Sequence, residues 1–419
     1  MLDGMKSNTH LDSEAGAVSE KPSLLNSLTR RSFLQAVGLG SAALTLPQGA
    51  RAQEKTIQGF EPAKTDTRAE AWKPISDRKI RVGLAGYGVC KFASAFGFQN
   101  HPNVEIVAVT DIVPDRCEAL AKVVSCQKTY PSAEEMVKDG RIEAVFIATD
   151  APSHARLCIE ALKRGKHVAS AVPAVYGSLD DAHKLIETVK STGMKYMMFE
   201  TSYFHEDVYA MRQIYNAGGL GKLLYSEGEY FHYMPTPIDS YKGWRIGLPP
   251  QWYPTHSNAY YVGVTGGSFT EVSCMGMPSV IEYLKPANNA YKNPFGTEIA
   301  LFRTSEGGMA RMGVAWDSPG SGGEMGRIRG QRGSYYGKYE GLEKQLPDIN
   351  RPPLPPGVPA GSHGGSHGHL MNEFVTAILQ NRKPLVDVAQ ALNMTVAGIM
   401  AHKSAMKGGE LLKIPQFKL

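Results

Sequence analysis

The chain has 419 residues, 42% of them hydrophobic and 20% charged, with a formal net charge of +5 at pH 7. This length and ordinary globular composition leave room for two domains. The charge is mild and no Lys/Arg-rich run is present, so the sequence argues against a nucleic-acid partner.

The first 52 residues carry the pattern of an export signal. Arg30-Arg31 is followed by Ser32-Phe33-Leu34, then by an apolar run over 36–46 that is too short to span a bilayer. Ala50-Arg51-Ala52 offers a small-x-small cleavage site. We therefore expect a twin-arginine signal peptide over 1–52, the twin-arginine translocase as a partner, and a periplasmic or otherwise exported protein. The alternative is an amphipathic first helix of a cytosolic protein.

The five cysteines favour folding in a reducing compartment. They are Cys90, Cys117, Cys126, Cys158 and Cys274, and they form no CxxC pair. An odd count without a spacing pattern argues against a disulfide framework. This suits a chain that folds in the cytoplasm before export.

Short apolar strands alternate with helices over residues 79–200, after a polar linker at 53–78. Strands are predicted at 80–85, 104–109, 144–148, 167–169 and 196–199, and helices at 91–99, 115–124, 154–164 and 179–191. Such alternation predicts an α/β domain of the Rossmann type, with a parallel sheet and helices on both faces.

Residues 201–419 have a different character. Antiparallel strands are expected at 223–233, 268–272, 298–304 and 308–316, and helices at 370–379 and 388–407, while 320–359 is rich in Gly, Pro and charge and should form hairpins and loops. This pattern predicts an α+β domain with an open, mostly antiparallel sheet and closing C-terminal helices. We expect it to hold the substrate and to form a homo-oligomer.

The turn after the first strand predicts a dinucleotide site. Gly86-Tyr87-Gly88-Val89 lies between a strand and a helix, and Asp111 closes the second strand, where it can accept from ribose hydroxyls. The pyrophosphate is expected at the helix N-terminus. The third glycine of the fingerprint is replaced by Lys91. NAD is thus favoured over NADP, although Arg116 could neutralise a 2′-phosphate.

Several side chains outside the turn are candidates for the chemistry. His256 and Tyr203 are the candidate acid/base groups, because a histidine near its ordinary pKa and a phenol can both transfer a hydroxyl proton. His154 is placed near the nicotinamide, and His232 near the substrate. Structural roles remain the alternative for all four residues.

Two further candidates lie in loops. Tyr253 is expected at the substrate, between two loop tryptophans. His363 shares a Gly/Ser loop with His367 and His369. That loop is typical of a substrate contact or a solvated segment more than of a zinc site, so no metal is predicted.

The sequence resembles the glucose–fructose oxidoreductase, inositol dehydrogenase and MocA-like family. The resemblance is carried by Gly83-Leu-Ala-Gly-Tyr-Gly88, Ala148-Thr149 with His154, and Gly165-Lys-His-Val168. It implies a Rossmann domain and an open-sheet domain with NAD(P) between them and a sugar-like substrate. The family usually has Glu-Lys-Pro after the His-Val strand, with the lysine in catalysis; here Ala171-Val172-Pro173 stands at that position.

A narrower resemblance is to the branch of NAD-dependent glycosidases of the N-acetylgalactosaminidase type. It is carried by Glu200-Thr-Ser-Tyr203, Glu227-Gly-Glu-Tyr-Phe-His232, Tyr253-Pro-Thr-His256 and His363-Gly-Gly365. The branch also lacks the lysine but keeps a glutamate where Ala171 stands. Its implied chemistry is redox-neutral: oxidation at C3, removal of the C2 proton, loss of the aglycone and return of the hydride.

Three functions remain open on the sequence. The first is an exported NAD-dependent oxidoreductase of a carbohydrate or polyol with a tightly bound cofactor. The second is the redox-neutral glycosidase, and the third a cofactor-binding protein that has lost catalysis. No free NAD pool is expected outside the cytoplasmic membrane, so an exported enzyme should keep and regenerate its cofactor.

Overall fold

The computed structural model describes residues 72–320 and 323–419, which belong to one unit, Thr56–Leu419. The predicted signal peptide and most of the predicted linker lie outside the described residues. Within the described ranges, no helix is long and apolar enough to cross a membrane.

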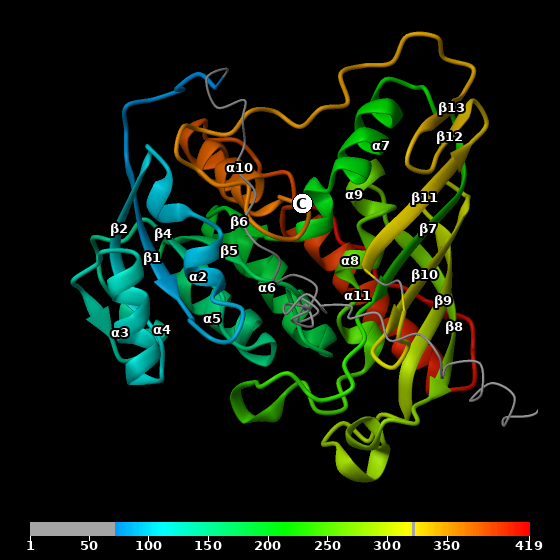
Figure 1. The fold of residues 1–419 in the computed structure, drawn as a ribbon, viewed down its shortest axis with the longest axis horizontal. Helices are drawn as coiled ribbons and strands as arrows, with labels where there is room; N and C mark the ends of the chain where they lie inside the picture. The colour runs from blue at the N-terminus through cyan, green and yellow to red at the C-terminus, as the bar shows by residue number, and fades with distance from the viewer. Residues whose placement is uncertain (1–71, 321–322) are drawn as a thin grey trace, which may run out of the picture. The chain divides into compact units, whose positions relative to one another are not determined.

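A six-stranded parallel sheet forms the first domain and confirms the predicted Rossmann architecture (Figure 1). The strand order is β3-β2-β1-β4-β5-β6, and neighbouring strands are parallel throughout. The strands are β1 (Ile80–Ala85), β2 (Val104–Thr110), β3 (Thr129–Tyr130), β4 (Ala144–Ile147), β5 (His167–Ser170) and β6 (Tyr196–Met198).

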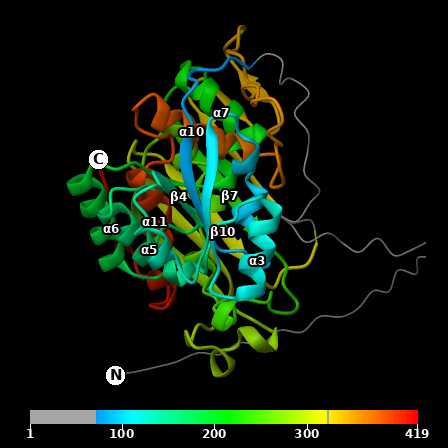
Figure 2. The same cartoon turned by 90° about the vertical axis from the view of Figure 1, so that its left-hand side faces the viewer.

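Helices cover both faces of this sheet, so its central strands are almost entirely apolar. In Figure 2, α5 and α6 lie on one side of the strands and α3 on the other. The order reverses between β1 and β4, which opens a crevice at the carboxyl ends of the strands, where ligands of such sheets bind. The helices are α2 (Phe92–Ala95), α3 (Pro114–Val123), α4 (Ala133–Met136), α5 (His154–Lys163) and α6 (Leu179–Thr192).

The predicted helix at 91–99 is wrong in length. It is a single turn, α2, because Gly97 adopts a left-handed conformation with φ 79° and interrupts it. A short 3₁₀ turn, Phe98–Asn100, follows. The strand β3 and the helix α4 were not predicted.

The second domain is built on an eight-stranded sheet in the order β13-β12-β11-β7-β10-β9-β8-β14. Only β7 and β10 pair in parallel; every other neighbouring pair is antiparallel, as predicted. The strands are β7 (Leu223–Phe231), β8 (Phe269–Pro278), β9 (Phe295–Thr304), β10 (Met309–Ala315), β11 (Gly323–Gly330), β12 (Gly333–Tyr335), β13 (Tyr339–Gly341) and β14 (Leu412–Lys413).

Four helices pack on one face of this sheet and leave the other face open (Figure 1). They are α7 (Glu206–Asn216), α8 (Thr255–Asn258), α9 (Val262–Thr265) and α11 (Val388–Ala405), while α10 (His367–Leu379) lies nearer the parallel sheet. The helix α7 was missed, although Val208, Met211 and Ile214 recur at helical spacing and are buried.

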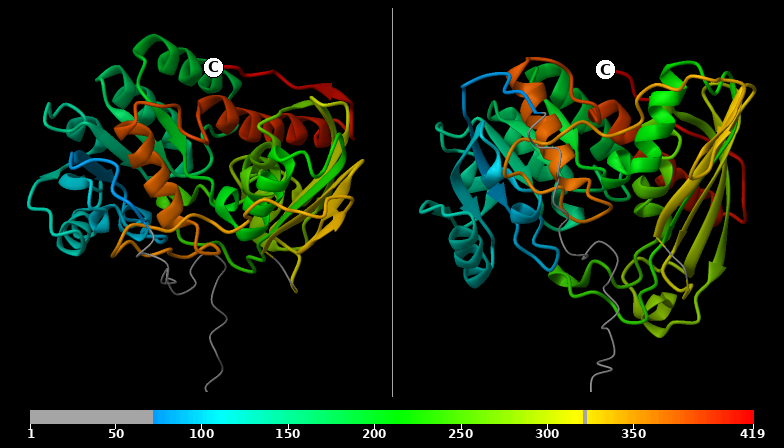
Figure 3. Two further views of the ribbon diagram at one scale, coloured as in Figure 1. Left: turned by 90° about the horizontal axis from the view of Figure 1, so that it is seen from above. Right: turned by 45° about the horizontal axis from the view of Figure 1, so that its top comes forward.

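The helix α11 joins the two domains. It contacts β6 of the first sheet as well as β8 and β9 of the second, and Figure 3 shows it running between the sheets. Asp387 caps its N-terminus by accepting from Gln390 N. Asn258 of α8 donates from Nδ2 to the Met394 carbonyl of α11 at 2.7 Å. Helix α8 is therefore held in a fixed position beside the carboxyl end of β6.

Short 3₁₀ turns connect several of these elements. They are η3 (Ala151–Ser153), η4 (Thr201–Phe204), η5 (Tyr241–Gly243), η6 (Pro250–Trp252), η7 (Glu282–Leu284) and η8 (Pro286–Asn288).

Candidate active site

Two adjoining cavities lie at the carboxyl ends of the parallel strands. The larger has a volume of about 620 Å³ and is lined by the loops after β1, β2, β4 and β5 and by the segment that follows β7. The smaller, of about 60 Å³, is lined mainly by the second domain. Both are lined by Cys90, Ala171, Val172, Arg245 and Tyr253, so a ligand in one would adjoin a ligand in the other.

The glycine turn is shaped to receive a ligand in the larger cavity. Gly86 has φ 100°, and a Cβ there would lie 2.3 Å from the Ala148 carbonyl oxygen, so the position requires glycine. A Cβ on Gly88 would meet nothing within 4 Å, and this residue lines the cavity. The open space above Gly88 fits the close approach of a diphosphate to the backbone.

Asp111 links the turn to the end of β2. Its carboxylate accepts from Tyr87 N at 2.6 Å and from Val113 N at 2.8 Å, and it lines the larger cavity. Tyr87 thus contributes its backbone N–H to the turn, while its ring is buried and lines neither cavity. The carboxylate stands where an acceptor for ribose hydroxyls is expected.

The remaining residues predicted for the cofactor also reach the larger cavity. Val89 lines it directly. His154 lines it too, and its ring nitrogens lie 2.9 Å from the Pro173 carbonyl and 3.2 Å from the Thr149 carbonyl. Burial lowers the pKa of His154, and as a neutral ring it can donate a hydrogen bond to one of these two carbonyls. Because α2 is only one turn long, the structure offers a diphosphate the backbone of the glycine turn rather than the N-terminus of a long helix.

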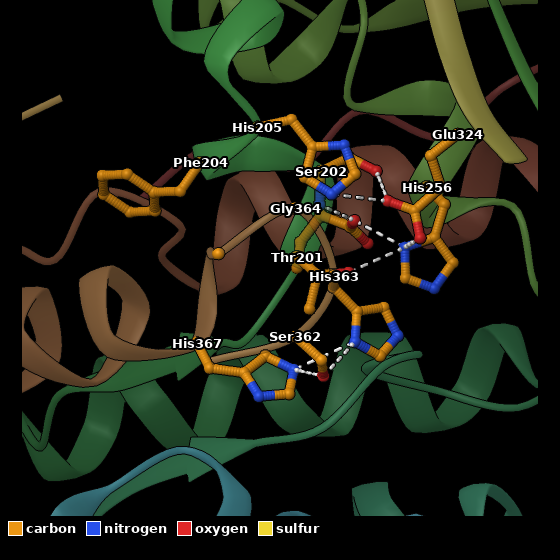
Figure 4. A network of polar contacts seen from close by, with 12 residues as sticks. Thr201, Ser202, Phe204, His205, His256, Glu324, Ser362, His363, Gly364 and His367 are labelled. Atoms are coloured by element: carbon orange, nitrogen blue, oxygen red, sulfur yellow. Dashed lines mark hydrogen bonds and ion pairs between the residues drawn. The ribbon is translucent and has the colours of Figure 1, made fainter. Parts of the chain in front are cut away.

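His256 of α8 lines the smaller cavity and is paired with two buried carboxylates (Figure 4). Its Nδ1 donates to Glu200 Oε1 at 2.8 Å and lies 3.7 Å from Glu324 Oε1. The side chains of His256, Glu200 and Glu324 are 4%, 0% and 2% exposed. Burial alone would lower the pKa of His256, but the two carboxylates outweigh it and raise this pKa to about 9. At neutral pH, His256 is therefore an imidazolium.

The two carboxylates come from different domains. Glu200 follows β6 and is fixed by accepting from Ser202 N at 2.9 Å. Glu324 lies on β11, where its Oε2 accepts from Ser202 Oγ at 2.5 Å and lies 3.1 Å from His205 Nε2. Neither carboxylate lines either of these two cavities, whereas His256 lines the smaller one. The carboxylates thus contact the imidazole on the side away from the smaller cavity, where they orient the ring and set its charge.

The same three side chains also have the donor types of a cation site. Their ligand atoms lie within 4.8 Å of one another. The Glu200–His256 separation of 2.8 Å is a hydrogen-bond distance, shorter than the about 3.3 Å that separates ligands of a tetrahedral zinc ion with bonds of about 2.0–2.1 Å. A shared proton accounts for the contact, and the absence of a metal remains a prediction that elemental analysis can check.

The other predicted substrate residues gather around His256. His232 and Tyr253 line the smaller cavity, and the Tyr253 ring centroid lies 5.7 Å from that of His256. His363 lines it as well, with its ring centroid 6.4 Å from that of His256. The sequence analysis therefore selected four residues from distant segments that meet at one cavity.

Tyr203 does not belong to this group. It is 3% exposed, lines neither cavity and packs against Arg212, whose guanidinium carbon lies 3.9 Å from the ring centroid. Its catalytic assignment is therefore not supported by the geometry. The phenols that do line the smaller cavity are Tyr253 and Tyr230, and the Tyr230 ring centroid lies 4.5 Å from that of His256.

The sequence analysis missed several residues of the site. Glu200 directly follows a predicted strand of a parallel sheet, and that position could have marked it as a site residue. Arg245 stands in a loop next to Trp244, and its guanidinium carbon lies 4.1 Å from the Trp244 ring centroid. Glu324 stands in a glycine-rich stretch whose pattern gives no indication of burial.

Comparison with known proteins agrees with this geometry. Residues 80–200 match a family described as an oxidoreductase family with an NAD-binding Rossmann fold (GFO_IDH_MocA). A glycosyl hydrolase family 109 protein of Streptomyces niveus is 25% identical over 324 residues, which is 70% of this chain and 65% of that protein. A family 109 protein of Bacteroides thetaiotaomicron is 30% identical over 200 residues, 43% of this chain and 42% of that protein. The chain thus matches less than two thirds of the length of these relatives.

Solved structures share the fold. Scyllo-inositol dehydrogenase from Lactobacillus casei, with bound NAD(H) and scyllo-inositol, is 17% identical, covers 80% of this chain and 99% of its own, and has a TM-score of 0.62. An oxidoreductase from Agrobacterium radiobacter, in complex with NAD⁺, L-tartaric acid and magnesium, is 16% identical over 80% of this chain and 98% of its own, with a TM-score of 0.64. Residues 80–200, which carry the glycine turn and the strand-end acid, thus match the NAD-binding Rossmann domain of the Gfo/Idh/MocA oxidoreductase family.

Proposed function

We propose that this protein is a redox-neutral, NAD-dependent glycosidase. The observation that carries the proposal is the imidazolium of His256, held by Glu200 and Glu324 at the wall of the smaller cavity. Cleavage of a glycosidic bond needs an acid that protonates the departing oxygen. A buried cation with one side toward the cavity fills that role.

Oxidation of a hydroxyl carbon, whether as net oxidation or as the first step of the glycosidase cycle, needs an acceptor for the hydroxyl proton. His256 already carries its proton at neutral pH, so that acceptor is another group in either case. Val172, which stands where family oxidoreductases have their lysine, is apolar, 5% exposed and lines both cavities. The site thus offers a placed acid but not the lysine of the family's dehydrogenases.

The larger cavity has the features that the dinucleotide needs. Gly86 and Gly88 leave the backbone open to a diphosphate, and Asp111 offers an acceptor for the ribose. When bound, NAD supplies a hydride acceptor that can return the same hydride within one turnover. The chain's own residues bind it, orient it beside the smaller cavity and handle the protons.

Two further considerations support the proposal. The curated relatives carry the name of a glycosyl hydrolase family. An enzyme that returns its hydride in each turnover needs no external NAD pool, which suits the export that we propose from the twin-arginine pattern at Arg30-Arg31.

A second function is favoured by one residue. Ala171 lines both cavities where the resembling glycosidase branch keeps a glutamate, and an alanine cannot act as a base. If no other group replaces that carboxylate, net oxidation of a sugar or polyol becomes the better assignment.

Product analysis separates these functions. We would incubate purified, cofactor-loaded protein in D₂O with p-nitrophenyl glycosides of N-acetylgalactosamine, galactose and glucose. The expected result is free sugar carrying deuterium at C2, free nitrophenol, and cofactor returned as NAD. Accumulation of ketosugar with NADH would instead establish net oxidation. No turnover of glycosides or polyols, with the dinucleotide still bound, would indicate a protein that has lost catalysis.

A further inference from the structure

A buried arginine lies in the segment that returns the chain from the second domain to the first. This segment, residues 342–366, runs from β13 to α10 (Figure 1). The Gly357 carbonyl near its far end accepts from Asn100 Nδ2 of the first domain at 3.2 Å. Arg351 lies about midway along it, and its side chain is only 9% exposed. Arginine side chains are seldom buried unless they are paired, so the contacts of Arg351 call for an explanation.

Arg351 joins two stretches of backbone that are far apart in the sequence. Its Nη1 lies 2.8 Å from the Phe204 carbonyl oxygen, 2.9 Å from that of Gly364 and 3.0 Å from that of Gly365. Hydrogen bonds from a charged donor are stronger than neutral ones. The other terminal nitrogen, Nη2, lies 3.1 Å from Glu206, whose side chain is 79% exposed. The inner half of the guanidinium therefore holds backbone, and the outer half faces the surface.

Both stretches carry side chains of the smaller cavity. The turn η4 ends at Phe204 and begins at Thr201, which lines the cavity and whose Oγ1 lies 3.3 Å from His256 Nδ1. The glycine-rich loop, residues 361–366, carries His363, which lines the same cavity. The His363 and His256 ring centroids are 6.4 Å apart and the rings are nearly parallel, at 22°. Arg351 thus ties together two parts of the cavity wall.

The glycine-rich loop needs such a restraint. Gly361, His363, Gly364 and Gly365 all have positive φ, and His363, with φ 49°, does so without the freedom of a glycine. A strained backbone persists only where its surroundings fix it. The two carbonyls that directly follow His363 are those that accept from Arg351.

We propose that Arg351 is a positioning residue that holds His363 and η4 at the separation that the substrate requires. The inference rests on the proposed glycosidase function, in which the sugar enters the smaller cavity. Arg351 lines neither of the two cavities, so it acts through the three carbonyls and not by touching substrate or cofactor.

Kinetics test this role. Arg351→Ala should lower kcat/KM for the p-nitrophenyl glycoside that the wild type cleaves best by about 10²-fold, because a displacement of about 1 Å near the reacting atoms can cost that much. The loss should appear mainly in kcat, since the substrate can still enter. NAD binding should stay within a few-fold of the wild type, because residues 361–366 do not line the larger cavity.

Two further variants control for charge and for folding. Glu206→Gln removes the exposed partner of Nη2 and leaves the three carbonyl contacts, so its activity should stay within a few-fold of the wild type. Arg351→Lys keeps a cation that donates hydrogen bonds on a shorter side chain, and we expect an intermediate loss. It carries the test if Arg351→Ala fails to fold.

Added guanidinium distinguishes a lost contact from general damage. The outer half of the Arg351 site faces the surface, so a guanidinium ion can enter the space that Arg351→Ala leaves. Guanidinium chloride at millimolar concentration should restore a large part of the activity of Arg351→Ala. Tetramethylammonium chloride at the same concentration has no N–H group and should restore none, and neither salt should stimulate the wild type.

The position of His363 can also be measured without turnover. Its ring centroid lies 5.8 Å from that of Phe92, so a displaced ring should change its NMR resonances. In ¹³C-histidine-labelled protein, the His363 signals are those that disappear in His363→Gln. They should shift in Arg351→Ala, return with guanidinium, and stay in place in Glu206→Gln.

The outcomes separate this inference from the function on which it rests. An Arg351→Ala or Arg351→Lys protein with unmoved His363 signals would overturn the positioning role, whatever its melting temperature. Glycoside cleavage by Arg351→Ala within a few-fold of the wild type would overturn it as well. Wild-type protein that cleaves no glycoside would overturn the proposed function, whereas the His363 signals would still decide whether Arg351 positions the loop.

Discussion

At the scale of single residues, the site is built around charged side chains that are buried. Glu200 and Glu324 are almost fully buried, and two buried carboxylates without a counter-charge would cost several kcal/mol. The imidazolium of His256 offsets that cost. The pKa of His256 in the folded protein, about 9, exceeds its ordinary value of 6.5. Protonated His256 therefore contributes its full stabilisation of the fold below about pH 6.5. This stabilisation is lost as the pH rises through about 9.

The same coupling predicts the pH dependence of catalysis. Glu324→Gln keeps the shape and a hydrogen-bonding group but removes one of the two charges that raise the pKa of His256. The basic limb of the kcat/KM profile should therefore move to lower pH. At a fixed pH on the basic side of the profile, kcat/KM should fall about tenfold for each unit by which the pKa of His256 is lowered. Glu227→Gln, whose carboxylate pairs with Arg327 on the outer face of the sheet, is the control. A basic limb that stays in place would show that Glu324 does not set the charge of His256.

At the scale of elements, the sequence predicted the strands and helices whose residues follow a regular hydrophobic pattern. Strand–helix alternation located five of the six parallel strands, and the C-terminal helices begin and end within about three residues of the prediction. Gly97 was overlooked as a helix breaker, so the helix α2 was predicted to be longer than it is. The two-residue strand β3 has no periodicity to detect.

The candidate site was only partly predictable for a physical reason. His256, His232 and His363 could be selected because histidines in loop-like or strand-end positions suggest chemistry. The pairing of His256 with Glu324 depends on which strand lies beside β7, and no local pattern specifies that register. Tyr203 was chosen for its position after a strand, but the chain turns there and packs its ring against Arg212.

The segment between β7 and η6 adds an element-scale feature to the cofactor site. It comes from the second domain, yet it lines the larger cavity with residues that include Lys242, Trp244 and Arg245. Asp239 of the same segment lies 3.6 Å from Arg116 of α3 in the first domain. The segment thus bridges the two domains beside the cavity, and its cations suit a ligand that carries a diphosphate.

We therefore predict that Arg245 helps to retain the dinucleotide. Arg245→Ala should weaken NAD binding by about 10–100-fold, since hydrogen bonds to charged groups contribute about 1.5–3 kcal/mol. Arg116→Ala is the matched control and should cost only a few-fold, because its ion pair with Asp239 is exposed. Calorimetric titration of NAD into cofactor-stripped protein measures both. Equal effects of the two substitutions would contradict a specific role for Arg245.

At the scale of the whole molecule, the outer face of the eight-stranded sheet lies apart from the active site and exposes apolar side chains. Alternate residues of β8, β9 and β10 point away from the packed helices, and Met275, Leu301 and Met309 are 64%, 60% and 63% exposed. Ion pairs, including Arg311–Glu229 at 2.5 Å, flank them on β10 and β7. Exposed apolar side chains within a charged rim are typical of a protein interface.

We predict that two copies of the chain associate through this face. Leu301→Glu combined with Met275→Glu should shift the protein to a smaller species in size-exclusion chromatography with light scattering, with little change in the circular dichroism spectrum. Leu342→Glu changes a residue of equal exposure, 65%, outside this patch and should leave the assembly intact. A wild-type protein that is monomeric at micromolar concentration would refute the prediction.

The last prediction concerns where the assembled protein works. The larger cavity is lined by both domains, so the dinucleotide should bind as they fold, in the compartment that contains NAD. A twin-arginine signal is suited to moving such a folded, loaded protein. Replacing Arg30 and Arg31 by lysine should therefore leave a folded, NAD-containing protein in the cytoplasm, whereas Arg51→Lys, beside the cleavage site, should not affect export. Cell fractionation with immunoblotting, and NAD analysis of each fraction, measure both. Normal periplasmic yield of the double-lysine protein would rule out the twin-arginine pathway, and periplasmic wild-type protein without dinucleotide would show that the cofactor is not carried across.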